Sequence, residues 1–537
     1  MTTRPPDYPT TRPPDILFIV LDTQRADRLG CYGYDKPLTP NLDRFAEGGV
    51  VFEQAIAPAQ WTVPSHASMF TGLYPTVHQL TQSSQRLNPA LPHLGEILSK
   101  AGYETVGFCN NPLVGVLNNG FKRGFQHFYN YGGAIPSLPQ ASSALPWPLN
   151  QMAESYTQFL RRISYPIQNY FGQSDLAFRL SLKSWATPLW SKMANFKGQN
   201  ARSVKDVSHF LRQRETQDSE KPLFLFLNLM ETHLPFWPPG HYVDRVAPYI
   251  RDSKEARTIM RTWNREAYRW AAPLADPLGD LESKILNDMY DAEVAYQDDY
   301  LGELFSVLDG RAKRSNTLTI IVADHGDGLG EHGYMGHAFV AYQELVHVPL
   351  IVDWPERWPQ ATRVASPVSA RRVFHTMLET LETNAPERQA SIAAEAQRLT
   401  LRHTANGRDP ENGTAFSEIY PPMNFVRAIK QRQPHLLEQF RCLSERRAIV
   451  REGEGLTHKL IHLDEKPDEL FDLAADPLEL NDIRREQPIL SASLDDQLKR
   501  MAGNTLLQRV RQTSGAPLDI TNDAQLMQRL RGLGYLD

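Results

Sequence analysis

Short apolar runs recur along the chain, and stretches with helical spacing separate them. The first run, ILFIVLD at residues 16–22, is rich in β-branched residues and is typical of a strand buried on both faces. Similar runs lie at residues 103–108, 222–230, 317–326 and 348–354. Strands that alternate with helices pack as layers around a parallel sheet. The pattern therefore predicts an α/β fold with a doubly wound, mostly parallel sheet.

The helical stretches between these runs have recognisable ends. Thr39 is placed to cap a helix that Pro40 begins and Gly48–Gly49 ends. Residues 283–310 carry apolar side chains at the spacing of one long helix. These helices supply the layers that cover the predicted sheet.

The chain divides by composition into a large domain and smaller parts. Residues 1–14 repeat TTRPPD, and such dense proline favours an extended lead-in. Residues 15–400 are expected to form the catalytic α/β domain, which carries an aromatic insertion at about 138–198. We interpret the insertion as a cap; the alternatives are a lid, an oligomer interface or a lipid-contacting surface. Residues 401–537 contain short half-exposed strands and a closing helix near 491–502, which predict a small C-terminal α+β subdomain.

Composition excludes several classes of protein. A net charge of -5 over 537 residues argues against a nucleic-acid partner and against attachment to an anionic membrane by charge alone. The 3 cysteines are far apart, which excludes a disulfide scaffold and a CxxC site. No run approaches the roughly 18 apolar residues of a transmembrane segment. We therefore expect a cytoplasmic protein without a transmembrane segment. Its expected partner is a small-molecule or lipid-like anionic ester, and assembly as a homo-oligomer is left open.

Polar residues follow three of the predicted strands at the point where each strand ends. Asp22 follows the first, Glu231-Thr232-His233 the second and Asp324-His325 the third. The carboxyl ends of parallel strands meet at one edge of a sheet, where ligands bind. Taken singly, each residue is better interpreted as a helix N-cap or a polar loop group than as a metal ligand. Together, Asp22, Asp324 and His325 predict a site for a divalent cation, because a buried carboxylate needs a partner of opposite charge.

The segment WTVPSHASMFTG at residues 61–72 predicts a helix that Pro64 helps to begin and Gly72 ends. Thr62 is expected just before that helix. A hydroxyl beside a positive helix end and a cation is placed for nucleophilic attack on an anionic ester. His66 is expected to face the same pocket. The alternative is that Thr62 is an ordinary helix cap.

A glycine-rich loop follows Asp324-His325 and carries further acidic and histidine side chains. Clusters of this kind often bind metals or anions. Three unrelated surface histidines are the alternative interpretation. The sequence leaves undecided whether this loop binds a second metal ion. The candidate ligands are Asp327, Glu331, His332 and His337.

In several of these segments the chain resembles the sulfatase family of the alkaline-phosphatase superfamily. The resemblance extends over most of the chain except the insertion. Its motifs, in chain order, are ILFIVLDTQRADRLGCYGYDKPLTPNLDRFAEGGVVFEQAIA, TVPSHASMFTGLYPTVH, VADHGDGLGEHG with YQELVHVPLIV, ELFDLAADPLELNDI and LRGLGYLD.

The resemblance implies one divalent metal ion (Ca, Mn, Zn or Mg). Asp22, Asp324 and His325 occupy the positions of its ligands, and Thr62, at the nucleophile position, would also touch it.

The resemblance also implies roles for histidines in catalysis. His233 matches the family's histidine that protonates the leaving group. His337 stands where the family usually has a lysine, and His66 where it usually has an arginine.

The departures from the family pattern bear most on function. Sulfatases oxidise a cysteine or serine to formylglycine, and Thr62 cannot give that aldehyde because its β-carbon carries a methyl group. Thr23 replaces a second acidic ligand, and GFCNN stands where GKWH is usual. We expect Asn110 and Asn111 to take over contacts to the ester. In the superfamily, threonine nucleophiles are typical of phosphodiesterases and phosphotransferases.

The sequence therefore predicts a metal-dependent hydrolase or transferase of phosphodiesters or phosphonate monoesters. Thr62 would attack, His233 would protonate the leaving alcohol, and His66 and His337 would stabilise developing charge. Water or an acceptor alcohol would then release a phosphothreonine. Two alternatives stay open: a sulfatase that uses unmodified Thr62, and a binding protein with a sulfatase-like fold that has lost catalysis.

Overall fold

The structure is a computed structural model of the 537-residue chain. The proline-rich lead-in and the aromatic insertion lie almost wholly outside the residues that it describes, as does the final LRGLGYLD motif. The described residues are 12–132, 138–139, 197–217, 221–379, 381, 387–453, 455–464 and 466–514.

An eight-stranded sheet forms the centre of the molecule, with strand order β12-β2-β11-β7-β1-β6-β4-β5. The strands from β7 to β5 are parallel to one another, whereas β11 runs antiparallel to both β7 and β2. The predicted mostly parallel α/β sheet is therefore confirmed. Its strands are β1 (Asp15–Leu21), β2 (Val50–Phe52), β4 (Glu104–Cys109), β5 (His127–Asn130), β6 (Leu223–Leu229), β7 (Thr317–Val322), β11 (Leu350–Asp353) and β12 (Thr362–Val364).

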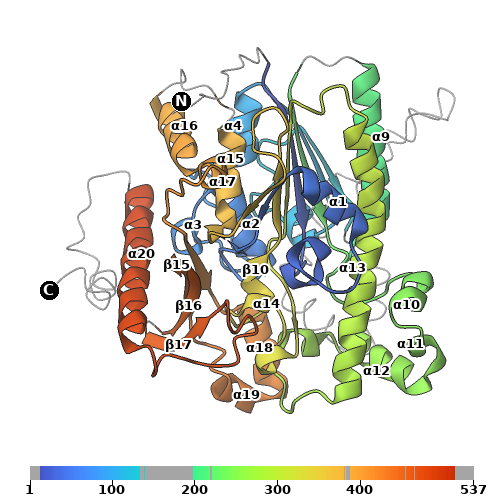
Figure 1. The fold of residues 1–537 in the computed structure, drawn as a ribbon, viewed down its shortest axis with the longest axis vertical. Helices are drawn as coiled ribbons and strands as arrows, with labels where there is room; N and C mark the ends of the chain where they lie inside the picture. The colour runs from blue at the N-terminus through green and yellow to red at the C-terminus, as the bar shows by residue number, and fades with distance from the viewer. Residues whose placement is uncertain are drawn as a thin grey trace.

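Helices cover both faces of this sheet, as Figure 1 shows. Leu17, Ile19 and Leu21 of β1 pack toward one face, and the residues between them pack toward the other, as the two-residue period of a strand requires. The first face is covered by α1 (Pro40–Gly48), α9 (Asn200–Thr216) and α13 (Asp280–Asp309), and the second by α2 (Thr62–Thr71), α4 (Leu94–Lys100), α15 (Val373–Leu378), α16 (Glu387–Leu399) and α17 (Leu401–Ala405).

Shorter elements connect these layers. The helices are α3 (Pro75–His78), α5 (Pro112–Gly115), α10 (Gly240–Val246), α11 (Tyr249–Asp252), α12 (Lys254–Arg265) and α14 (Gln343–Val346). The short strands are β3 (Ala55–Ile56), β8 (Gly328–Leu329), β9 (Met335–Gly336), β10 (His347–Val348) and β13 (Val368–Ser369).

A second, antiparallel sheet forms the C-terminal part of the described chain. Helices α18 (Met423–Arg432) and α19 (Pro434–Gln439) cover one of its faces and α20 (Pro488–Ser514) covers the other, so the closing helix is longer than the sequence indicates. The helix α17 packs with the first domain, and the predicted division at residue 400 stays a prediction. The strands are β14 (Thr414–Ile419), β15 (Arg446–Gly453), β16 (Leu456–Leu463) and β17 (Lys466–Asp472).

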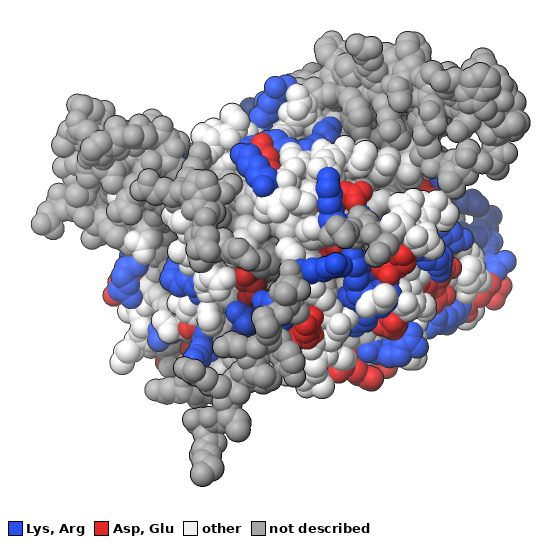
Figure 2. Space-filling view, turned by 90° about the horizontal axis from the view of Figure 1, so that it is seen from above, with Lys and Arg blue, Asp and Glu red and all other residues white. Residues whose placement is uncertain are grey.

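The charged side chains on the face shown in Figure 2 are mixed in sign. Lysine and arginine are interspersed with aspartate and glutamate among the residues drawn in colour. In the described part of the chain, no helix is both long and apolar enough to cross a membrane.

Helix α2 lies at the centre of the molecule and is buried along its whole length. It ends at Gly72, whose φ of 72° is in the left-handed region that favours glycine. A Cβ atom at this position would lie 2.6 Å from Phe374 Cδ1 and 2.8 Å from His375 Cε1. The close approach of α15 therefore also requires glycine.

We predict that Gly72→Ala destabilises the protein by about 2 kcal/mol or more, because strained backbone and a steric clash act together. Gly48→Ala is the matched control, since nothing lies within 4 Å of a Cβ atom there. Thermal unfolding should show a lowered midpoint for Gly72→Ala alone. Equal midpoints for the two variants would contradict this packing.

Candidate metal centre and nucleophile

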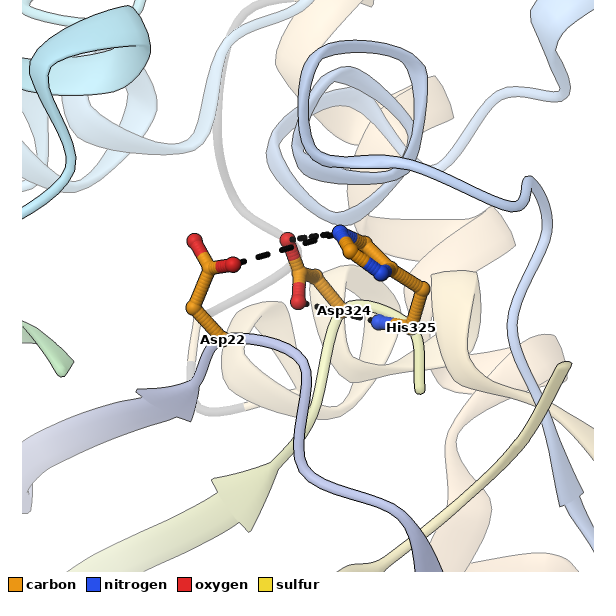
Figure 3. A group of neighbouring side chains, drawn as sticks. All are labelled: Asp22, Asp324 and His325. Carbon is orange, nitrogen blue, oxygen red and sulfur yellow. Dashed lines mark hydrogen bonds and ion pairs between the residues drawn. The ribbon is translucent and has the colours of Figure 1, made fainter. Parts of the chain in front are cut away.

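Asp22, Asp324 and His325 meet at the carboxyl edge of the central sheet. Asp22 follows β1, and Asp324-His325 follow the neighbouring strand β7 (Figure 3). His325 Nε2 lies 3.4 Å from Asp324 Oδ2 and 3.9 Å from Asp22 Oδ1. All three side chains are fully buried. Among the described residues, this is the group that brings three metal-ligating atoms within 4.8 Å of one another.

The free atoms of this cluster fit a divalent cation. Asp22 Oδ1 and Asp324 Oδ2 are buried and have no hydrogen-bond donor. Burial, followed by the charge of Asp324, raises the pKa of Asp22 well above its usual value. A bound cation would supply the missing partner and favour the ionised carboxylate. Carboxylate oxygen and imidazole nitrogen suit Mn²⁺ and Zn²⁺, and the oxygens also suit Mg²⁺ and Ca²⁺.

His325 is held in the tautomer that a metal ligand needs. Its Nδ1 donates a hydrogen bond to its neighbour's carbonyl, Gly326 O, at 2.7 Å, which leaves Nε2 facing the two aspartates. Burial lowers the pKa of His325 to about 4. The ring is therefore neutral near pH 7, and its Nε2 lone pair can bind a cation.

Thr62 lies against this cluster at the start of α2. It is the first residue of the helix, with Trp61 at the N-cap, and not the residue before the helix as the sequence indicates. Thr62 Oγ1 lies 3.3 Å from His325 Nε2 and 3.5 Å from Asn111 Nδ2. The partial positive charge of the helix start favours an alkoxide or an anionic ester at this point.

His66 supports the cluster from one turn further along α2. Its Nδ1 donates to Thr62 O at 3.0 Å and lies 3.2 Å from Asp324 Oδ2. Burial opposes the charged form, but the contact with Asp324 raises the pKa of His66 above its usual value. The structure therefore places His66 against the carboxylate of Asp324 and the backbone of Thr62. Its predicted role in catalysis stays a prediction.

The two predicted substrate-binding asparagines point in different directions. Asn111 Nδ2 donates to Asp22 Oδ2 at 2.6 Å and is close to Thr62. The amide of Asn110 instead donates to Ser203 Oγ and to Asn228 O, each at 2.8 Å. Asn111 is thus brought into the site and Asn110 into the supporting structure around it. A contact of either with an ester stays a prediction.

Asn228 is a site residue that the sequence analysis missed. It is a polar residue within the apolar run of β6, and this break in the run is the sequence signal that could have identified it. Its Nδ2 lies 3.5 Å from Asp22 Oδ2 and 3.5 Å from His66 Nε2, and its Oδ1 accepts from Asn111 N at 2.9 Å. It therefore fixes the positions of three groups that line the site.

His233 and His337 lie beside His325 as a row of imidazoles. The ring centroids are 5.0 Å apart for His233 and His337 and 4.5 Å apart for His325 and His337. His233 Nδ1 donates to Leu234 O at 2.8 Å, which fixes the tautomer of the ring. Burial and then His337 lower the pKa of His233 well below its usual value, so the free site holds it neutral. His337 Nδ1 lies 2.8 Å from the buried carboxylate of Asp327.

The residues suggested for a second metal ion do not converge on one point. Asp327 pairs with His337, and Glu331 Oε1 accepts from Arg25 Nη1 at 2.7 Å. His332 Nδ1 lies 3.0 Å from Glu344 Oε1. These contacts give each side chain a protein partner.

Thr23 is the residue directly after Asp22. Its φ of 63° is unusual for a β-branched residue. Its Oγ1 donates to Asp22 O at 2.6 Å, and its N–H lies 3.3 Å from Asp324 Oδ1. The turn at Thr23 therefore links the backbone of Asp22 to the carboxylate of Asp324.

Comparison with known proteins relates this geometry to a family. A family model described as Sulfatase matches residues 14–383. The uncharacterized sulfatase YidJ of Escherichia coli is 25% identical over 384 residues, which cover 70% of this chain and 69% of that protein. An arylsulfatase of Clostridium perfringens is 26% identical over 357 residues, which cover 64% of this chain and 69% of that protein.

The structure is also similar to solved structures. The phosphonate monoester hydrolase of Agrobacterium radiobacter aligns with a TM-score of 0.59 and 19% identity, over 92% of this chain and 96% of that chain. This likeness shows a shared fold.

We predict that a divalent cation stabilises the protein through these carboxylates. Addition of Mn²⁺, Zn²⁺ or Ca²⁺ to chelator-treated protein should raise the thermal midpoint, by the equivalent of about 2.7 kcal/mol at a hundredfold excess over Kd. Asp324→Asn should abolish the increase, and Asp276→Asn, at an exposed site, should retain it. An equal increase in all three proteins would contradict the site.

The His332 contact predicts a pH-dependent contribution to stability. Although burial opposes it, the hydrogen bond that His332 donates to the carboxylate of Glu344 raises the pKa of His332 to about 9, above the 6.5 expected when unfolded. Its stabilisation is therefore complete below pH 6.5 and is lost as the pH rises through 9. His332→Gln should destabilise the protein by about 1.5–3 kcal/mol at pH 6 and by much less at pH 10. A difference in unfolding midpoint that does not change with pH would contradict this assignment.

Proposed function

The chain belongs to the Sulfatase family of the alkaline-phosphatase superfamily, and on that premise we propose that it cleaves phosphodiesters or phosphonate monoesters through a covalent Thr62 intermediate. The observation that supports this proposal is the position of Thr62 Oγ1. It lies at the positive end of a buried helix, 3.3 Å from a metal-ligand histidine and beside two buried carboxylates that need a cation.

The chemistry of threonine favours a phosphorus ester over a sulfate ester. Oxidation of the secondary alcohol of Thr62 would give a ketone and not the aldehyde of formylglycine, so the nucleophile is the hydroxyl itself. A bound metal ion would lower the pKa of that hydroxyl and neutralise a non-bridging oxygen of the ester. Thr62 then attacks phosphorus in line, a P–O bond forms to Oγ1, and the bond to the leaving alcohol breaks.

The surrounding side chains position the nucleophile and the ester. Asn111 directs its amide toward both Asp22 and Thr62, so it is placed to donate to an ester oxygen or to the hydroxyl. His66 holds the carbonyl of Thr62 and thereby the first turn of α2. These contacts orient the nucleophile before the ester binds, which lowers the entropy loss of the reaction.

His233 and His337 are placed to handle protons on the leaving side. In the free site His233 is neutral, with its proton on Nδ1 and a lone pair on Nε2. An anionic ester beside it would favour the protonated ring, which could then give a proton to the leaving alkoxide. The neutral ring that results can accept a proton from the water or acceptor alcohol that attacks phosphorus, and the bond from phosphorus to Thr62 Oγ1 then breaks.

A sulfate ester is the second candidate substrate. The similar arylsulfatase of Clostridium perfringens and the sulfatase YidJ motivate it. The reaction would use the same unmodified hydroxyl of Thr62 against sulfur. Sulfate esters are weak electrophiles for a plain alkoxide, so we place this candidate second.

We predict that the metal-loaded protein turns over bis(4-nitrophenyl) phosphate or a phenylphosphonate monoester faster than 4-nitrophenyl sulfate. Thr62→Ala should lower kcat/KM by on the order of 10³-fold or more, because the covalent route is lost. Thr62→Ser keeps the hydroxyl and should retain much more activity than Thr62→Ala. Release of 4-nitrophenol gives the rates directly.

Two results would contradict the proposal. A higher rate on the sulfate than on both phosphorus esters would favour the sulfatase candidate. Undiminished activity of Thr62→Ala on the phosphorus esters would exclude Thr62 as nucleophile.

A further inference from the structure

A pocket separate from the Asp22, Asp324 and His325 cluster opens beside the loop that carries His233. Its volume is about 360 Å³, and its lining includes Lys197, Glu231, Trp237 and Tyr296. Glu231 is two residues before His233 in the turn after β6. Thr232, between them, donates to Asp22 O at 2.9 Å. The pocket wall and the metal site therefore share one short, fixed segment of chain.

Lys197, in the wall of this pocket, contacts two carboxyl groups. Lys197 Nζ lies 2.6 Å from Glu293 Oε1 and 3.7 Å from Glu231 Oε1. Glu293 is fully buried behind the wall, and its Oε2 has no hydrogen-bond donor. Burial, despite Lys197, raises the pKa of Glu293 to about 8. Lys197 therefore makes its short contact with a carboxyl that is largely protonated near neutral pH, and it is not within hydrogen-bond distance of Glu231.

Glu231 is the carboxylate that faces the pocket. Its side chain is 9% exposed, and its separation of 3.7 Å from Lys197 is longer than a hydrogen bond. Lys197 instead makes its short contact with the deeper carboxyl, Glu293. A carboxylate this buried favours a second cation within reach.

Aromatic rings complete the lining. Trp237 is 46% exposed, and its backbone N–H donates to Glu293 Oε1 at 2.6 Å. Tyr296 is half-buried on the opposite element, α13. Arg202, at the rim, is directed toward Asp206 at 3.9 Å and Gln199 at 3.2 Å. An aromatic face beside a buried carboxylate favours a ligand that is both positively charged and apolar.

We propose that this pocket binds an organic ammonium group carried by the leaving alcohol of the substrate. The proposal rests on the proposed function, because it assumes that the ester is held at Thr62 with its leaving group toward His233. An amino alcohol esterified to the phosphorus would place its cation against Glu231 and Trp237 while its oxygen accepts a proton from His233. The substrate class is then an ester that is anionic at phosphorus and cationic at its leaving end.

Binding of choline and of 3,3-dimethyl-1-butanol to the full, metal-loaded protein tests the proposal. The two alcohols share size and shape and differ in the charge of the head group. Titration calorimetry should show that choline binds about tenfold more tightly or better, which is the size expected for a desolvated cation on an aromatic face. Glu231→Gln and Trp237→Leu should each bring the ratio of the two affinities toward one. Glu47→Gln, on the exposed side of α1, is the matched control and should leave the ratio unchanged.

The outcomes separate this inference from the proposed function. Equal affinity for the two alcohols, or no binding of either, overturns the pocket even if bis(4-nitrophenyl) phosphate is hydrolysed. An unchanged affinity ratio in Glu231→Gln overturns it as well. Selective choline binding that depends on Glu231 and Trp237, without hydrolysis of any phosphorus ester, supports the pocket and contradicts the proposed function.

Discussion

Two carboxylates buried at the same edge of a parallel sheet, Asp22 and Asp324, determine how the rest of the site is built. Burial penalises each charge, and their proximity adds repulsion, as the raised pKa of Asp22 shows. The amide of Asn111 donates to Asp22 and the backbone N–H of Thr23 donates to Asp324, while the imidazole of His66 lies 3.2 Å from Asp324 Oδ2. Asp22 Oδ1 and Asp324 Oδ2 still have no hydrogen-bond donor, and a divalent cation would supply their missing partner.

The position of Thr62 follows from this arrangement. Helix α2 packs in the second hydrophobic layer, and its first turn must approach the carboxylates because Ser65 Oγ donates to Asp324 O at 2.6 Å. The helix end at Gly72 then allows α15 to pack closely behind it. The same constraint that stabilises the carboxylates therefore brings a hydroxyl and a positive helix end to one point.

Several of these features could be predicted from the sequence. The apolar runs indicated the strands, and the rule that parallel strands share a carboxyl edge brought Asp22 near Asp324 although they are far apart in the chain. Side-chain direction could not be predicted: Asn110 and Asn111 are adjacent, yet one points into the site and the other toward Ser203. Asn228 was missed because its polar side chain is hidden in an apolar run.

Other differences have similarly local causes. Thr39 does not cap α1, because its hydroxyl donates to Asp43 Oδ1 at 3.0 Å. The glycine-rich loop has the composition of a metal site, but its acidic and histidine side chains pair with Arg25, Glu344 and one another. The pocket beside His233 left no motif in the sequence, since Lys197, Glu231 and Glu293 come from three separate segments.

The central claim is that Thr62 becomes covalently phosphorylated during turnover. The most direct measurement is mass spectrometry of the protein after rapid acid quenching during hydrolysis of a phosphodiester, with the modified peptide sequenced. The account predicts an added phosphoryl ester on Thr62 that is absent from Thr62→Ala. Steady turnover of the same diester with Thr62 unmodified at every quench time would contradict it.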